Sequence, residues 1–95
     1  MPEAFHTHAF KGVTVFVDGH VHLFRGISSA SPNTPGHTHI IAGETTVNNG
    51  HSHGYNIVTE GPHKVNSGHY HYFSGNTQVA MGHSHGMSST TFEYP

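Results

Sequence analysis

Twelve of the thirteen histidines lie in six copies of the tripeptide His-x-His. Alternate residues of a β-strand point to the same face, so each pair can offer two imidazole nitrogens to one metal ion. Successive pairs begin 14, 17, 14, 18 and 14 residues apart, a spacing too regular for a random enrichment in histidine. The pattern therefore predicts an ordered array of transition-metal sites.

The six pairs predict two layers of ligands. If three parts of the chain surround a pseudo-threefold axis, their first pairs meet in one layer and their second pairs in another. Six imidazoles complete an octahedron around Fe(II), Ni(II) or Co(II), which predicts about two ions per chain, with iron preferred. Zn(II) takes four ligands, so two pairs could hold it instead. The predicted ligands are His6, His8, His37, His39, His69 and His71 in one layer, and His20, His22, His51, His53, His83 and His85 in the other.

Three similar units of about 31 residues make up one predicted domain, at residues 5–35, 36–67 and 68–95. Each unit carries two His-x-His pairs whose first residues are 14 positions apart. Thr, Val, Ile, Phe and Tyr, with frequent Gly, favour short β-strands, and no segment has a helical period. We expect an all-β fold of antiparallel strands and hairpins in a pseudo-threefold arrangement, with a β-solenoid as the alternative architecture.

Turn and bend signals divide the expected strands. Asp18-Gly19 and Asn49-Gly50 have the composition of two-residue hairpin turns. Three glycines, one per unit, are predicted at strand bends or bulges, namely Gly12, Gly43 and Gly75. The segments 28–36 and 59–68 contain prolines and are expected to be loops. His63, the one histidine outside the pairs, is expected to be a loop residue, with an accessory metal ligand as the alternative.

An apolar residue follows each pair by two positions and should share its strand face. We expect these side chains to form apolar plugs beside the metal layers and to exclude water. They are Phe10, Phe24, Ile41, Tyr55, Phe73 and Met87. Thr14, Thr45 and Thr77 either continue this face or supply hydrogen bonds in turns.

Composition makes an additional source of stability necessary. Leu, Ile, Val and Phe total 19 of 95 residues, which provides little material for a core, and cysteine is absent. Metal ions or self-association into a homo-oligomer or filament remain as sources of stability, and the sites could close within one chain or between chains.

A net charge of −2 with three basic residues argues against nucleic-acid binding. No segment resembles a signal peptide or a membrane span, so a cytoplasmic location is expected by default, with leaderless export or extracellular assembly as alternatives.

Two resemblances accompany these patterns. The run His-x-His-x-Phe-x-Gly-x-Thr, followed by Asp-Gly-His-x-His-x-Phe-x-Gly, resembles the YmaF family of small bacterial proteins, best over residues 6–28. The YmaF resemblance implies a repeat fold with His-x-His pairs and no particular biochemical activity. The pairs alone are also similar to the His-x-His iron sites of trimeric phage tail fibres and spike tips.

Three functions compete on these patterns. A metal-stapled structural protein is the first, and a self-assembling filament subunit or a metal store is the second. A metal-dependent enzyme is less favoured, because a catalytic ion needs an open coordination position and six histidines would fill the shell. His37, His39 and Glu44 resemble the first metal motif of cupins, but Glu44 has no counterpart in the other units. No catalytic residue is nominated.

Overall fold

The computed structural model describes residues 5–66 and 68–94, and within them it contains strands, bridges and turns but no helix. The prediction of an all-β fold is therefore confirmed. The described residues accordingly include no helix with the length and hydropathy that crossing a bilayer requires. The strands are β1 (Phe5–His6), β2 (Ala9–Val13), β3 (Leu23–Ile27), β4 (Ser31–Pro32), β5 (Ile40–Glu44), β6 (Gly54–Val58), β7 (Pro62–Val65), β8 (Gly68–Asn76) and β9 (Gly86–Thr90).

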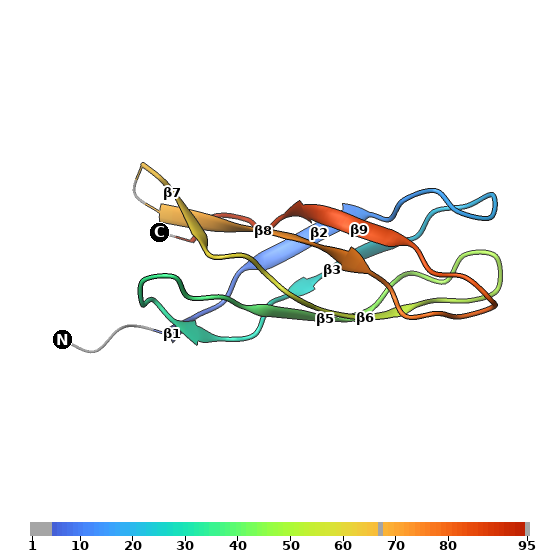
Figure 1. Cartoon of the computed structure of the whole chain (residues 1–95), viewed down its shortest axis with the longest axis horizontal. Coiled ribbons are helices and arrows are strands. Elements are labelled where there is room, and N and C mark those ends of the chain that lie inside the picture. Colours follow the sequence, from blue (N-terminus) through green and yellow to red (C-terminus); the bar gives the residue numbers. More distant parts are fainter. Residues whose placement is uncertain (1–4, 67, 95) are drawn as a thin grey trace.

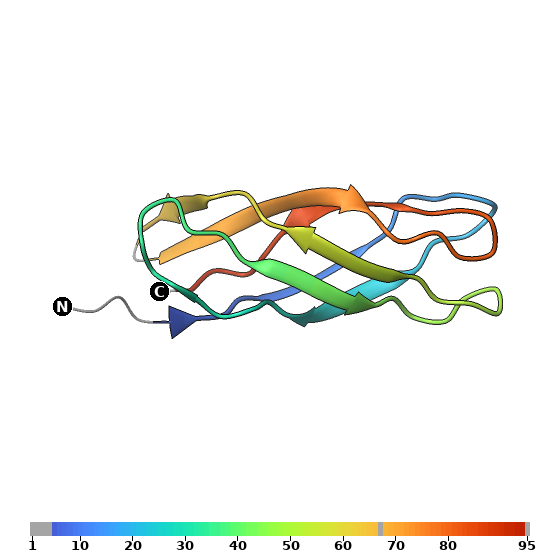
Figure 2. The same ribbon diagram turned by 60° about the horizontal axis from the view of Figure 1, so that its bottom comes forward.

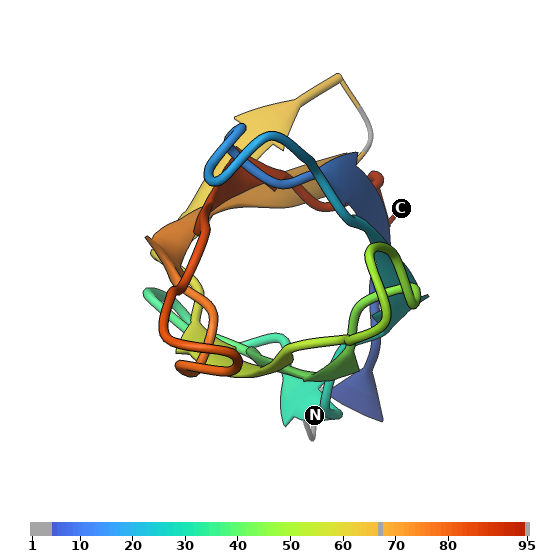
Figure 3. The same ribbon diagram turned by 90° about the vertical axis from the view of Figure 1, so that its right-hand side faces the viewer.

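Three antiparallel hairpins form the body of the molecule. β2 pairs with β3, β5 with β6, and β8 with β9, each over five residue pairs. The hairpins run lengthwise in a rod of 49 × 21 × 16 Å, with the three turns at one end and β1 and β7 at the other (Figures 1 and 2). Viewed along the rod, the strands surround a common axis (Figure 3). The bounds proposed for the repeat units remain a prediction.

Each hairpin closes through a two-residue turn with positive φ angles. Asp18-Gly19 has φ angles of 51° and 81°, and Asn49-Gly50 has 54° and 79°. Both turns were predicted, and their conformation matches the twist of the flanking strands. Met81-Gly82 makes the third turn in the same way, with φ angles of 52° and 79°. Sequence reasoning missed this turn because methionine is not a usual residue at a positive φ.

The two segments expected to be loops also contain strands. β4 pairs with β1, and β7 pairs with the first half of β8. These parts of the prediction were wrong, because β1 and the long strand β8 extend beyond the hairpins and offer edges for additional pairing. His63 consequently lies in β7, where its ring stacks on Tyr70 with centroids 5.7 Å apart.

The core lies in the middle of the rod. The six apolar residues predicted to share a face with the histidines are all buried, and Ile57 joins them. The prediction of bulges at the three glycines was wrong, because the strand register runs through each of them without interruption. Gly12 instead makes room for an aromatic ring: a Cβ atom there would lie 2.5 Å from Cζ of Phe24.

Candidate metal centre

Twelve histidines gather in two clusters, and within each cluster six ring nitrogens lie within 4.8 Å of one another. The tip cluster, near the hairpin turns, contains His20, His22, His51, His53, His83 and His85. The base cluster, near the ends of the chain, contains His6, His8, His37, His39, His69 and His71. These are the two layers expected from the sequence, and one chain supplies all six members of each. Both clusters could hold a metal ion. His63 and Glu44 belong to neither cluster.

Each His-x-His pair has an inner member, nearer the core, and an outer member. The inner histidines are at most 2% exposed and are His8, His22, His39, His53, His71 and His85. In the base cluster the outer histidines are also buried, at 4%, 8% and 6% exposed for His6, His37 and His69. In the tip cluster the outer histidines are partly exposed, and they are His20, His51 and His83. The two clusters therefore differ in their access to solvent.

Every inner histidine has Nδ1 within hydrogen-bond distance of a main-chain carbonyl oxygen outside its own hairpin. The pairs are His8 with Phe92 (2.8 Å), His22 with Thr46 (2.8 Å), His39 with Ser29 (2.8 Å), His53 with Gln78 (2.9 Å), His71 with Glu60 (2.8 Å) and His85 with Val15 (2.7 Å). A carbonyl oxygen can only accept, so Nδ1 carries the proton. Nε2 is then left with a lone pair, which is the form that binds metal.

Four outer histidines also have Nδ1 beside a carbonyl oxygen, but these contacts are local in sequence. They are His20 with Asp18 (3.1 Å), His37 with Thr34 (2.8 Å), His51 with Asn49 (3.2 Å) and His83 with Met81 (3.3 Å). The three contacts in the tip cluster are longer than those of the inner histidines. In ten of the twelve rings, carbonyl contacts thus direct the lone pair of Nε2 away from the main chain.

The Nε2 atoms face one another inside each cluster. Those of His20 and His22 are 3.0 Å apart, and those of His51 and His83 are 3.2 Å apart. Nδ1 of both His51 and His83 lies beside a carbonyl, so neither Nε2 in that pair has a proton to donate, and two lone pairs repel unless a positive charge lies between them. Three buried Nε2 atoms have no hydrogen-bond partner among the described residues, namely those of His53, His71 and His85. A central cation would satisfy all of these atoms.

Buried hydroxyl groups hold the strands that carry the inner histidines. The main-chain N–H of His53 donates to Oγ1 of Thr45 (3.0 Å), while the N–H of Thr45 donates to the carbonyl of His53 (2.9 Å). The hydroxyl thus replaces the main-chain acceptor of a regular ladder. The same exchange joins every inner histidine to a serine or threonine, in the pairs His8–Ser28, His22–Thr14, His39–Thr59, His71–Thr91 and His85–Thr77.

The sequence contains a signal for all six hydroxyls, because a serine or threonine stands six residues after the second histidine of each pair. Sequence reasoning singled out only Thr14, Thr45 and Thr77 and left their role open. They contribute hydrogen bonds, but to the histidine-bearing strand and not within turns. Ser28, Thr59 and Thr91 were missed as members of the site.

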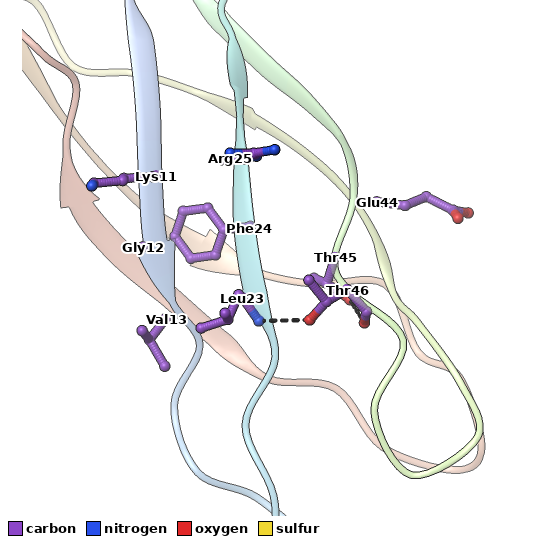
Figure 4. A pocket seen from close by; sticks show the side chains of 9 residues that line it. All are labelled: Lys11, Gly12, Val13, Leu23, Phe24, Arg25, Glu44, Thr45 and Thr46. Carbon is purple, nitrogen blue, oxygen red and sulfur yellow. Dashed lines mark hydrogen bonds between the residues drawn. The ribbon is translucent and has the colours of Figure 1, made fainter.

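The residue after each hydroxyl links its hairpin to a neighbour. The main-chain N–H of Thr46 donates to the carbonyl of Leu23 (2.8 Å), and the carbonyl of Thr46 accepts from Nδ1 of His22. The side-chain Oγ1 of Thr46 accepts the main-chain N–H of Leu23 (3.0 Å). The last of these bonds is visible in Figure 4, at the edge of a groove of about 710 Å³ between β3 and β5. No histidine lines this groove. Equivalent main-chain bonds begin at residues 15, 29, 60, 78 and 92, so the hairpins are joined in a cycle at each cluster.

Burial keeps several clustered imidazoles neutral. Desolvation, together with a smaller effect of the neighbouring imidazoles, lowers the pKa of His39, His69 and His71 from 6.5 to about 4. For His39 and His71 the hydrogen bond to a carbonyl partly opposes this shift. Desolvation also lowers the pKa of His8, His22 and His53. At neutral pH these rings are therefore in the unprotonated form that metal binding requires.

Polar groups at the hairpin turns reach the outer histidines of the tip cluster. Asp18 places Oδ2 3.3 Å from Nδ1 of His83, and the Asn49 side-chain amide lies 3.1 Å from Nδ1 of His20. Both contacts run from the turn of one hairpin to the histidine of the next. The corresponding turn residue of the third hairpin is Met81. The turns thus place a carboxylate and an amide beside the tip cluster, and the carboxylate favours a cation there.

Comparison with known proteins places the chain in a family. The family model YmaF, described as spore germination protein GerY/YamF, matches residues 1–60, which is more than half of the chain. The chain belongs to the YmaF family. The matched segment of this YmaF chain carries four of the six His-x-His pairs, two from each cluster. No curated protein and no solved structure matches the chain.

Proposed function

We propose that this YmaF chain is a metalloprotein in which each six-histidine cluster binds one transition-metal ion, and that the ions serve mainly to hold the three hairpins together. The observation that carries this proposal is the orientation of the rings. Ten Nδ1 atoms lie beside carbonyl oxygens, and the corresponding Nε2 atoms converge in two buried groups. Such carbonyl contacts are the usual support of a metal-bound histidine.

The spacing of the nitrogens favours six-coordinate ions. An octahedron has edges √2 times as long as its metal–ligand bonds, so the edges of 3.0–3.2 Å correspond to bonds of about 2.1–2.3 Å. A tetrahedral zinc site with bonds of about 2.0–2.1 Å would need edges of about 3.3–3.4 Å. We therefore propose Fe(II) as the preferred ion, with Ni(II) and Co(II) as alternatives and about two ions per chain.

A structural role agrees with the ligand number and with the small core. Six nitrogens saturate an octahedral ion and leave no position for a substrate or an activated water. Each cluster takes two histidines from each hairpin, so an ion in either cluster ties all three hairpins together. Because one chain supplies both clusters, neither proposed site needs a second chain. The family description names spore germination, and a metal-stapled rod would serve there as a durable structural component.

Two linked measurements test the proposal. Untagged protein prepared without oxygen should contain about two ions per chain, and it should unfold cooperatively at a lower temperature once a chelator removes them. Saturation of one site at 100 times its dissociation constant stabilises a fold by about 2.7 kcal/mol, so two sites should raise the melting temperature by at least about 20 °C. A chelated protein that melts at the same temperature as the loaded protein contradicts a structural role. Folded protein that binds no transition metal refutes the proposal as a whole.

A further inference from the structure

We infer that the two metal sites have different tasks: the tip cluster exchanges its ion with the surroundings, whereas the base cluster retains its ion. The inference rests on the proposed function and adds a metal-exchange activity to it. The exchanged species is a divalent transition-metal ion, taken up from its hydrated form and released to a small chelator or a metal-accepting protein. Three differences between the clusters carry the argument, namely exposure, the anchoring of the outer histidines, and the charge beside them.

The outer histidines of the tip cluster are weakly anchored. Their Nδ1 atoms contact carbonyls two residues earlier at 3.1–3.3 Å, and the other contacts of Nδ1 in His20 and His83 are to exposed turn side chains, Asn49 and Asp18. Beyond β2 and β3, an isolated bridge between Val17 and His20 is the last ladder contact before the turn, with N···O distances of 3.1 and 3.2 Å. His51 and His83 stand at equivalent isolated bridges in the other two hairpins. One outer histidine can therefore swing away when a single turn frays, while the main-chain hydrogen bonds between hairpins remain in place.

Two of the three outer histidines of the base cluster, His6 and His69, are held by longer-range structure, whereas His37 contacts the main chain only at Thr34, three residues earlier. His69 lies in β8 between two partners, pairing with Lys64 of β7 on one side and with Tyr94 on the other. His6 pairs with Ser31 of β4, and its ring stacks on that of Tyr94 with centroids 4.4 Å apart. Detaching either ring from a bound ion requires strand pairing or ring stacking to break. All six members of this cluster are buried.

Charge and exposure give the tip cluster a route for ligand exchange. The side chain of Asp18 is 65% exposed and stands 3.3 Å from His83, where it can attract a hydrated cation before the imidazoles bind it. Release runs in the opposite direction: one Nε2–metal bond breaks, a water oxygen takes the vacated position, and an incoming chelator replaces the remaining nitrogens in turn. No electron or proton needs to move. The difference in exposure rests on His20 and His51, because His83 is 9% exposed and His37 of the base cluster is 8% exposed; the base cluster contains no carboxylate.

The kinetics of metal release test this inference. Untagged protein is loaded with Co(II) without oxygen, desalted, and mixed with excess EDTA, and the cobalt remaining on the protein is followed over time. We expect two phases of equal amplitude whose rates differ by at least about tenfold. The double variant His51→Ala/His53→Ala, which disables the tip cluster, should lose the fast phase and keep the slow one.

Two variants outside the ligand set separate the clusters without removing a histidine. Gly50 has a φ angle of 79° and a Cβ there would meet nothing within 4 Å, so Gly50→Ala strains one turn without a clash. It should accelerate the fast phase by about fivefold and leave the slow phase unchanged. Tyr94→Ala removes the stacking on His6 and should accelerate only the slow phase.

The outcomes distinguish this inference from the proposed function. The exchange activity is refuted if two cobalt ions are retained and leave in a single phase, or if the double variant of the tip cluster loses the slow phase. Neither result refutes the proposed metal sites. Equal acceleration of both phases by Gly50→Ala also refutes the exchange activity. If the desalted wild-type protein retains no cobalt, the proposed function itself is refuted, and the inference with it.

Discussion

The hydroxyl network makes a precise prediction at Thr45. The Thr45→Val substitution keeps the β-branched shape of the side chain and removes only Oγ1. In the native protein this oxygen accepts the N–H of His53 at 3.0 Å and donates to the carbonyl of Thr46 at 3.1 Å. Because the same Thr46 carbonyl also contacts Nδ1 of His22, one missing atom affects two members of the tip cluster.

The expected cost follows from the burial of the group left unpaired. Thr45 is 6% exposed and His53 is 1% exposed, so water cannot readily replace the lost acceptor. A buried donor without a partner costs about 1–3 kcal/mol. For a chain of this size, 1 kcal/mol shifts the melting temperature by about 4–8 °C, so we expect a decrease of about 5–20 °C. Loss of supporting hydrogen bonds should weaken metal binding in the tip cluster by about 10- to 100-fold.

Thermal unfolding followed by circular dichroism and a competitive metal titration measure the two effects. Thr38→Val is the matched control, because Thr38 is exposed between His37 and His39 and the substitution is chemically the same. It should leave both quantities close to those of the wild type. If Thr45→Val and Thr38→Val behave alike, the hydroxyl does not support the cluster and the network has been misinterpreted.

Two further predictions concern acid and the core. In metal-free protein, the base-cluster histidines whose pKa is about 4 should stay neutral when folded but take up protons when unfolded, where the pKa is 6.5. The free energy of unfolding should therefore be highest above pH 6.5 and fall as the pH decreases from 6.5 towards 4. Chemical denaturation across this range measures the trend. The opposite trend would mean that the clustered rings are protonated in the folded protein, which would contradict the lowered pKa. Gly12→Ala should destabilise the loaded protein by about 1–3 kcal/mol, because the new Cβ would lie 2.5 Å from the Phe24 ring. Gly61→Ala, whose Cβ would meet nothing closer than 3.9 Å, is its control in the same melting experiment, and equal melting temperatures would contradict the packing of this ring.

Local sequence patterns predicted the all-β fold and the two Asx-Gly turns, because strand composition and turn residues act over a few positions. The strands β4 and β7 were not predictable in this way. Each exists because a strand that extends beyond the hairpins, β1 or β8, presents an edge at the base of the rod, and Pro32 and Pro62 on the added strands favoured a loop. The glycines were misread for a related reason, since the ring that fills the space above Gly12 comes from the opposite strand.

The histidine positions within the candidate site were also foreseeable, because strand alternation places both members of a pair on one face. The grouping into two clusters needed only the order of the pairs along the chain. The supporting carbonyls were not foreseeable, because main-chain oxygens leave no mark on the sequence. The contact between Val15 and His85, for example, spans 70 positions and depends on how hairpins one and three meet.

The arrangement of polar groups is the physical reason for proposing cations in the interior of this rod. Carbonyls fix the proton on Nδ1 and hydroxyls fix the main chain, so the strands hold the imidazoles at a spacing of 3.0–3.2 Å whether or not they repel one another. An apolar core of seven side chains between the clusters offers little energy to offset that repulsion. Protonation cannot relieve it at neutral pH, because burial lowers the pKa of the rings. A central cation would satisfy all six Nε2 atoms at once, so the proposed sites predict that folding and metal binding depend on each other through the same contacts that orient the histidines.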